Sequence, residues 1–348
     1  MPGQTYSLGT PVDIGRIDHE LKKLWADGEG AMTRSSHINL AVFSEEPGSL
    51  ARNTQLVAEI AENHACRAIV ITADPSGKQD RVEAWISAHC HVTQAGSKRV
   101  CSEQISVLLE GASVKLLPSI VFSQLDSDLP LYLWWQTEFA DGVEPQLWAC
   151  VDRLIYDSQG WHDFDRQMRL VEAAQREAKQ RIVLCDLNWT RLLHFRRAFA
   201  QFFDHPASHH HFNEIESATL QFSRDYRSTA LLFIGWLAAR LAWDIVSSPK
   251  PGLINLRNAV GKSLRIALEE KECPPIAAFT AQSGELEFCV ASCGDLLEVC
   301  RGARGEKHTR QLVPSGENNP VRLMSEELMR GGPHHVYLSA VEKVRSLL

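Results

Sequence analysis

The stretch Asp128-Leu129-Pro130-Leu131-Tyr132-Leu133-Trp134-Trp135 is the part of the sequence from which the fold can be worked out. Its apolar run has no polar alternation, which is typical of a short strand buried on both faces at the centre of a sheet. Pro130 has no N–H to donate and fits best at the first position of such a strand. Tryptophan is seldom fully buried, so we expect the two at its end to be covered by the rest of the chain or by another protein.

The segments around this stretch alternate between helix and strand patterns. Helices are predicted at residues 13–26, 50–63, 113–125 and 164–179, and strands at residues 38–43, 68–72, 82–92, 100–109 and 153–156. The β-α-β order is typical of a parallel sheet with right-handed crossovers. Only a modest loop separates residues 82–92 from residues 100–109, which favours an antiparallel pair at the edge of that sheet.

The character of the chain changes after residue 205. The predicted elements are then a strand at residues 212–222, a helix at 229–243 that is apolar nearly all round, strands at 253–258, 263–268, 276–281, 286–291 and 296–301 with a turn at Gly284, and a last helix at 336–348. Strands in succession without helices between them are typical of an antiparallel α+β domain.

The length of 348 residues is too great for one ordinary core, so two domains are expected. We therefore predict an α/β protein with a Rossmann-like, mostly parallel N-terminal sheet in residues 1–205 and an antiparallel α+β C-terminal domain in residues 206–348. The linker is predicted at residues 205–213, which contain Pro206 and a run of histidines.

The composition is that of an ordinary globular protein, with 44% hydrophobic and 23% charged residues. The net charge of −7 and the isoelectric point near 6.1 argue against a nucleic acid or an anionic membrane as partner. The sequence begins without a basic and apolar leader, which favours a cytoplasmic location. The nine cysteines form no C-x-x-C pair, so reduced thiols are expected.

Several motifs resemble enzyme signatures without meeting their requirements. Gly261-Lys262-Ser263 resembles the end of a phosphate-binding loop, but Leu256 stands where the loop needs glycine, and strands rather than a helix flank it. No G-x-S-x-G, H-E-x-x-H or paired C-x-x-C motif is present. The carboxylates form no pair that could be placed across a cleft. The sequence thus offers no catalytic residues, and we expect no cofactor.

Three groups of histidine and cysteine could be drawn as metal sites. They are His89 with His91, the triplet His209-His210-His211, and the irregularly spaced set Cys289, Cys293, Cys300 and His308. A solvated strand face, a loop whose side chains do not converge and a set of core cysteines are the respective simpler interpretations. We therefore predict no metal site.

The aromatic and arginine residues favour a protein-binding role instead. Tryptophan and arginine dominate the energetics of protein interfaces. The segment Asp186-Leu187-Asn188-Trp189-Thr190-Arg191 opens a helix that Asp186 or Asn188 can cap. The candidate partner-binding residues are Trp134, Trp135, Asp186, Trp189 and Arg191. The simpler interpretation of the three tryptophans is core packing.

Five segments together resemble one protein family. They are residues 100–105 (VCSEQI), 128–135 (DLPLYLWW), 186–191 (DLNWTR), 231–241 (LLFIGWLAARL) and 258–264 (NAVGKSL). In this order the set is similar to the OpcA family, the glucose-6-phosphate dehydrogenase assembly proteins, from about Pro11 to the C-terminus. The resemblance implies a bacterial, non-catalytic activator. Such a protein binds glucose-6-phosphate dehydrogenase, promotes its active oligomer and acts at the entry to the oxidative pentose phosphate pathway. In photosynthetic members this role is tied to thiol redox state, but no cysteine pair here matches a regulatory dithiol.

A second hypothesis is an enzyme or sensor that binds a phosphorylated sugar at the carboxyl ends of the parallel strands, where open α/β sheets hold their ligands. In that case Lys262, Arg191 and the edge of the strand that contains Trp134 would line the pocket. The two hypotheses differ in whether the isolated chain binds glucose 6-phosphate.

Overall fold

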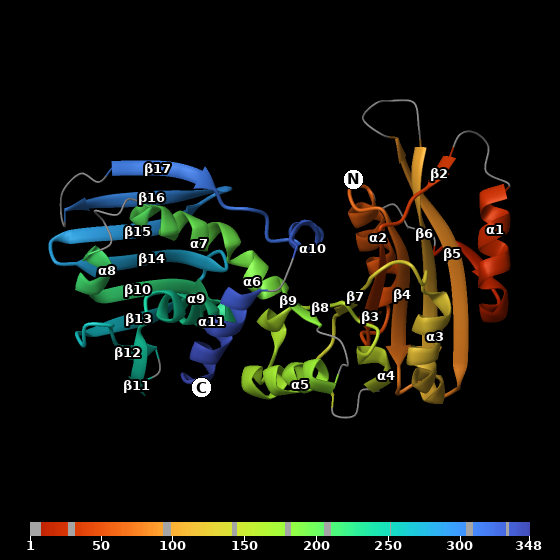
Figure 1. Cartoon of the computed structure of the whole chain (residues 1–348), viewed down its shortest axis with the longest axis horizontal. Helices are drawn as coiled ribbons and strands as arrows, with labels where there is room; N and C mark the ends of the chain where they lie inside the picture. The colour runs from red at the N-terminus through yellow and green to blue at the C-terminus, as the bar shows by residue number, and fades with distance from the viewer. Residues whose placement is uncertain are drawn as a thin grey trace. The chain divides into compact units, whose positions relative to one another are not determined.

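The computed structural model describes residues 8–26, 32–92, 99–140, 145–177, 182–204, 210–250, 252–303, 309–331 and 334–348 (Figure 1). The chain packs into two compact units: residues 1–156, 166–185 and 319–332 form unit 1, and residues 157–165, 186–318 and 333–348 form unit 2. The prediction that residues 1–205 and 206–348 are separate domains concerns which parts of the chain fold independently, and it stays a prediction.

The sheet of unit 1 is built around the predicted central strand. Its strand order is β1-β5-β6-β4-β3-β7-β8-β9, with β2 beside β6. The strands are β1 Thr10–Val12, β2 Met32–Arg34, β3 Ile38–Ser44, β4 Cys66–Asp74, β5 Arg81–Val92, β6 Arg99–Glu110, β7 Leu131–Trp135, β8 Arg153–Tyr156 and β9 Val183–Asp186. β7 lies between β3 and β8 and runs parallel to both, and β5 and β6 are antiparallel. The prediction of a mostly parallel N-terminal sheet is therefore confirmed.

The helices of unit 1 pack against this sheet or against one another. Asp13 caps the first of them as predicted, because its carboxylate accepts the Gly15 N–H at 2.8 Å. In α2, the buried residues Leu50, Val57 and Ile60 recur at helical spacing. The helical elements are a 3-10 turn Ile14–Arg16 leading into α1 Ile17–Ala26, α2 Ser49–Ala61, a 3-10 turn Gly111–Leu116 leading into α3 Leu117–Gln124, α4 Pro145–Trp148, α5 Phe164–Glu177 and α10 Pro320–Met329.

One prediction about the cysteines is wrong. Cys90 and Cys101 lie directly opposite each other in the β5–β6 pair, with Cα atoms 4.1 Å apart, and they form a disulfide. The cysteines were expected to be reduced because none of them form a C-x-x-C pair. The register of a long hairpin brings together residues eleven positions apart, which local spacing does not reveal.

The sheet of unit 2 has the order β11-β12-β13-β10-β14-β15-β16-β17. The strands are β10 Ile215–Ser223, β11 Asp244–Lys250, β12 Leu253–Arg257, β13 Ser263–Lys271, β14 Ile276–Ser283, β15 Leu286–Cys293, β16 Leu296–Ala303 and β17 Thr309–Pro314. The five predicted antiparallel strands from β12 to β16 are present, and Gly284 makes the β14–β15 turn with a φ of +58°. One pairing differs from the prediction, because β10 runs parallel to β13.

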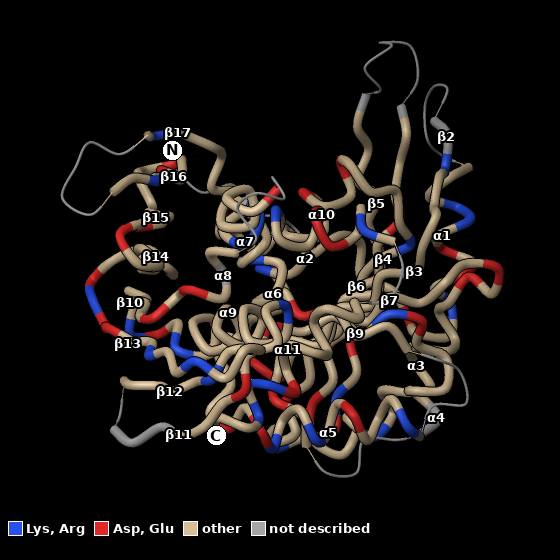
Figure 2. Tube along the Cα trace, turned by 60° about the vertical axis from the view of Figure 1, so that its left-hand side comes forward, with Lys and Arg blue, Asp and Glu red and all other residues tan. Residues whose placement is uncertain are grey.

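The helices of unit 2 lie along one face of this sheet (Figures 1 and 2). They are α6 Leu187–Arg191, α7 Leu193–Ala200 with a 3-10 turn Gln201–Phe203, α8 His210–Glu214, a 3-10 turn Arg224–Tyr226 leading into α9 Arg227–Arg240, and α11 His335–Arg345. α8 begins within the predicted linker at residues 205–213 and ends one residue beyond it, so part of that segment is helical. α9 packs tightly on α11, since a Cβ on Gly235 would lie 2.5 Å from the Ala340 carbonyl oxygen. In the described residues, every helix is too short or too polar to cross a bilayer.

Candidate functional site

Trp134 and Trp135, two of the predicted partner-binding residues, lie in the core of unit 1. Their relative exposures are 5% and 4%. The Trp135 ring centroid is 4.3 Å from that of Phe43 and 5.6 Å from that of Phe139, with which it stacks. Both tryptophans are thus covered by the chain itself. Contact with a partner through them stays a prediction and would require this core to open.

The segment at residues 100–105 lies on β6 and carries buried polar groups. Glu103 is 1% exposed, and its carboxylate pairs with the guanidinium of Arg67 at 2.5 Å and with that of Arg34 at 2.8 Å. The Trp25 indole N–H donates to the same carboxylate at 3.1 Å. Because a buried charge without partners is costly, this cluster fixes how α1, β4 and β6 pack.

The sheet of unit 1 reverses its strand order between β3 and β7, which is where open α/β sheets bind ligands. The loop that follows β3 carries Glu45 and Glu46. The Arg52 guanidinium donates to Glu46 at 2.7 Å and lowers the pKa of that carboxyl group. The Thr137 hydroxyl donates to Glu45 at 3.3 Å. Two carboxylates at this position repel a phosphate group, so the geometry argues against a dinucleotide or sugar phosphate here.

Asp186, the third predicted residue, is the last residue of β9 and the N-cap of α6. Its side chain is 1% exposed and accepts hydrogen bonds from the Asn188 N–H at 2.9 Å, the Ser158 N–H at 3.0 Å, the Ser158 hydroxyl at 2.6 Å and the Tyr337 hydroxyl at 3.1 Å. Burial raises the pKa of Asp186 to about 6, and the charge of Asp157 adds to this effect. The hydrogen bonds from Ser158 and Asn188 act in the opposite direction.

Asn188 extends this cluster towards α9. Its amide donates to the Ser158 hydroxyl at 3.1 Å and to the Ser228 hydroxyl at 3.2 Å. Its carbonyl oxygen accepts from the Thr229 hydroxyl at 2.5 Å and from Arg191 at 3.0 Å. The side chain therefore uses its whole hydrogen-bonding capacity inside the protein, as a structural residue does.

Arg191 is equally committed to partners within unit 2. Its guanidinium makes a two-point contact with the Asp157 carboxylate at 2.7 and 3.1 Å, and its Nε donates to Asn318 at 2.6 Å. The side chain is 8% exposed. Such a bidentate pair holds the guanidinium in one orientation. Arg191 is therefore not a free cation for a phosphate.

Trp189, the remaining predicted residue, is 3% exposed. The guanidinium of Arg196 lies 3.4 Å from its ring centroid, and the ring of Tyr337 lies 5.6 Å away. The structure thus brings Asp186, Trp189 and Arg191 together at α6, while Trp134 and Trp135 belong to unit 1. Partner contact through the α6 residues stays a prediction.

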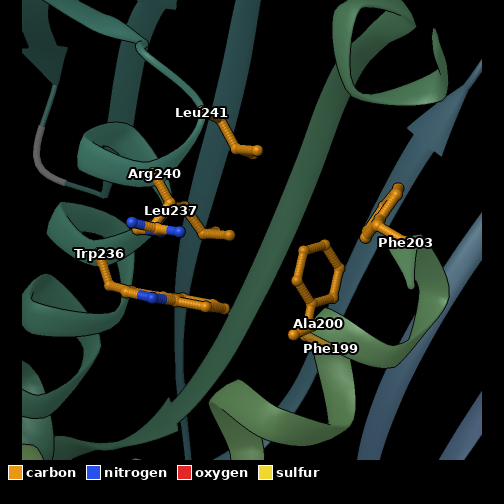
Figure 3. A pocket seen from close by; sticks show the side chains of 7 residues that line it. All are labelled: Phe199, Ala200, Phe203, Trp236, Leu237, Arg240 and Leu241. Carbon is orange, nitrogen blue, oxygen red and sulfur yellow. The ribbon is translucent and has the colours of Figure 1, made fainter. Parts of the chain in front are cut away.

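An apolar pocket of about 220 Å³ lies on unit 2 between α7 with its 3-10 turn and α9 (Figure 3). We call it the α7–α9 pocket. It is lined by Phe199, Ala200, Phe203, Trp236, Leu237, Arg240 and Leu241. The side chains of the two elements point towards each other across it, and Arg240 supplies its charge (Figure 3). The sequence did not predict this pocket, because it gave only a core role to the apolar residues of both helices.

The structure describes most residues of the three histidine and cysteine groups at which no metal is predicted. His89 is half-buried on β5, not on a solvated face, and its ring nitrogen Nε2 lies 3.0 Å from the Gln104 side-chain oxygen.

The ligand atoms of His210, His211 and Glu214 on α8 lie within 4.8 Å of one another, so this group has the spacing to hold an ion. Burial lowers the pKa of His211, and His210 and Arg301 add to this effect, so a positive charge is disfavoured there. The absence of a metal at α8 stays a prediction. Cys289 and Cys300 are opposite each other on β15 and β16, while His308 and His209 lie outside the described residues.

Fold and site together define a two-unit α/β protein with a Rossmann-like sheet in one unit and a mostly antiparallel sheet in the other. Solved structures with similar folds include an aldose-aldose oxidoreductase from Caulobacter crescentus, with a TM-score of 0.49, 9% identity and coverage of 89% of this chain and 95% of that one. They also include a glucose-6-phosphate dehydrogenase in complex with glucose 6-phosphate, with a TM-score of 0.44, 8% identity and coverage of 90% and 87%. Both matches have a TM-score below 0.5 and a sequence identity below 10%.

The sequence comparisons identify the family. Residues 57–173 match the glucose-6-phosphate dehydrogenase subunit N-terminal domain, and residues 182–341 match the C-terminal domain of the same subunit. The chain is 30% identical over 344 residues to the "Putative OxPP cycle protein OpcA" of Nostoc punctiforme, covering 91% of this chain and 71% of the relative. A protein of the same description from Synechocystis is 25% identical over 314 residues, covering 83% and 65%. The chain belongs to the OpcA family, as its five motifs predicted.

Proposed function

We propose that this protein binds glucose-6-phosphate dehydrogenase in the cytoplasm and raises its activity by favouring its active oligomer, without performing chemistry itself. The observation that carries the proposal is that two family models, both described as domains of a glucose-6-phosphate dehydrogenase subunit, match residues 57–173 and 182–341. The curated relatives are described as OxPP cycle proteins, which is consistent with a role at the entry to that pathway.

The internal pairing of the charged groups supports a binding role. Both cations that the sequence suggested for binding an anion are paired with a carboxylate of the same chain. Arg191 pairs with Asp157, and Lys262 pairs with Glu216 at 2.7 Å. Asp186 is enclosed by four donated hydrogen bonds. A group that is to act as acid or base needs a path to its substrate, and these groups contact the protein instead.

Activation of this kind is a difference in affinity between two states of the partner. A protein shifts an enzyme towards its active form only by binding that form more tightly. A coupling free energy of about 1–3 kcal/mol would lower the glucose 6-phosphate concentration needed for half-maximal rate by about five- to 150-fold.

The test is a titration of purified dehydrogenase with glucose 6-phosphate, with and without this protein in excess. We expect a lower half-saturating concentration and a larger dehydrogenase oligomer by sedimentation velocity. Unchanged kinetics together with no complex in sedimentation would refute the proposal.

The alternative of a sugar-phosphate sensor stays a prediction, and both of its cations are paired within unit 2. Its test is the melting temperature of the isolated protein with and without glucose 6-phosphate. If the protein is a sensor, the sugar phosphate should raise its melting temperature.

The net charge of −7 supports the further proposal that neither a nucleic acid nor a membrane is the partner.

A further inference from the structure

The α7–α9 pocket combines an apolar wall with cations that have no partner among the described residues. Arg240 lines the pocket and is exposed at the end of α9. Arg197 is exposed on α7, one helical turn before the pocket residue Ala200 and on the same side of the helix. Among the described residues, neither guanidinium makes a hydrogen bond or an ion pair. Both are therefore available to an outside carboxylate.

The elements that form the pocket are also free of acidic residues. Residues 193–203 and 227–240 contain Arg196, Arg197, Arg227 and Arg240 but no aspartate or glutamate. The chain as a whole carries a net charge of −7. The two elements that form the pocket thus carry only positive charge on an acidic protein, with the exposed Asp204 directly after Phe203, and this charge favours an acidic partner segment and steers its approach.

The size of the pocket decides what kind of ligand it takes. Sites for small molecules usually enclose about 300–1,000 Å³. The α7–α9 pocket has about 220 Å³, and aromatic and leucine side chains form most of its wall. It matches one large apolar side chain better than a whole metabolite. A buried apolar anchor surrounded by polar contacts is the usual centre of a protein interface.

We propose that the α7–α9 pocket receives a large apolar side chain of glucose-6-phosphate dehydrogenase, and that a carboxylate next to this side chain pairs with Arg240. The inference rests on the proposed function, because it takes the dehydrogenase as the partner. It goes beyond that function by assigning the contact to a defined place on unit 2.

Two variants separate the apolar and the charged parts of the contact. Ala200→Trp places an indole at the exposed wall of the pocket and occupies the space of the incoming side chain. Arg240→Glu reverses the charge of the pocket. The matched control is Arg227→Glu, which changes the same charge at the other end of α9, about 20 Å away at 1.5 Å per residue. An acidic residue is also favourable at that helix start.

The measurement is the binding of the intact variants to purified dehydrogenase by surface plasmon resonance at two salt concentrations. We expect Ala200→Trp to raise Kd by about tenfold or more, mainly through faster dissociation. We expect Arg240→Glu to slow association and to weaken its dependence on salt, with Arg227→Glu unchanged. Arg240→Ala, which adds no acidic charge at a helix end, should give a smaller effect of the same sign.

The outcomes distinguish this inference from the proposed function. If the wild-type protein neither binds nor activates the dehydrogenase, the proposed function fails and the inference fails with it. If the wild type activates and the folded variants bind as tightly as it does, only the pocket assignment is overturned. An effect of Arg227→Glu equal to that of Arg240→Glu would also overturn it, because general charge would then explain the binding.

Discussion

The buried carboxylate of Asp186 should make the stability of the protein depend on pH in a window where exposed aspartates do not titrate. Burial and the neighbouring Asp157 raise the pKa of Asp186 from 3.8 to about 6. Between these pH values the folded protein binds a proton that the unfolded chain has lost. The contribution of this group to the free energy of unfolding is therefore complete below about pH 3.8 and is lost as the pH rises through about 6.

The size of the effect follows from the shift. A shift of one pKa unit corresponds to 1.36 kcal/mol, so a rise of about two units makes the folded protein about 3 kcal/mol less stable at pH 7 than it would be with Asp186 protonated. Asp186→Asn keeps an oxygen that can cap α6 and removes the charge. The difference in free energy of unfolding, wild type minus variant, should fall by about 2.5 kcal/mol between pH 4 and pH 7, because part of the change lies below pH 4.

The assay is urea unfolding of both proteins at half-unit steps from pH 4 to pH 7.5. All other carboxylates are common to the two proteins, so their titration cancels in the difference. Asp225→Asn, which neutralises an exposed carboxylate in the 3-10 turn before α9, is the control for the loss of one negative charge. A difference for Asp186→Asn that does not vary with pH would refute the buried, proton-binding role of this residue.

Four other predictions follow from the packing of the units. Arg67→Met leaves the Glu103 carboxylate without its closest cation and should cost about 3–5 kcal/mol in urea unfolding, while Arg52→Met, at an exposed pair, should change stability by less than about 1 kcal/mol. Gly235→Ala places a methyl group 2.5 Å from the Ala340 carbonyl oxygen and should cost about 1–3 kcal/mol by forcing α9 from α11, with an unchanged melting temperature as the contrary result. Reductant should lower stability by about 2–3 kcal/mol through the Cys90–Cys101 disulfide and have no effect on Cys101→Ser. A fragment of residues 1–205 lacks α10, so Arg153 loses Glu327, which lies 3.7 Å away in the full chain. The fragment should have a lower melting temperature than the intact protein, and an equal melting temperature would favour the domain boundary at residue 205.

The parts of the fold that the sequence predicted are those with strong apolar periodicity. β7 is a continuous apolar run, and β3 and β4 contain the apolar runs Leu40–Phe43 and Ala68–Ile71; their burial on both faces is what such runs indicate. β11 and β17 were missed because both are edge strands. β11 contains Pro249, and β17 exposes most of its side chains, so neither has the alternation of a half-buried strand. The parallel β10–β13 pair was missed because strand direction depends on the crossover through α9, not on the strands themselves.

The candidate site was predictable only where its partners are local. The capping role of Asp186 depends on Asn188, two residues away, and was expected from the sequence. The burial of the same carboxylate depends on Ser158 and Tyr337, which are 28 and 151 residues away. Tryptophan and arginine are common in interfaces and also have structural roles within a protein. The sequence alone therefore could not show that Arg191 is paired inside the protein while Arg240 has no partner among the described residues.

That distinction decides which surface can bind a partner. An arginine contributes to affinity only if its donors are still free to form new hydrogen bonds, because a guanidinium that exchanges one carboxylate for another gains little. The Arg191 side chain is 8% exposed and bonded to Asp157, Asn188 and Asn318, so a partner that bonds this guanidinium would have to replace these contacts. Arg240 is exposed beside an apolar pocket and, in the described part of the chain, has no such bonds to lose. A motif that identifies the family can therefore stabilise the fold, while the contact that we propose with the partner falls to other residues of the same unit, which the fold leaves unpaired.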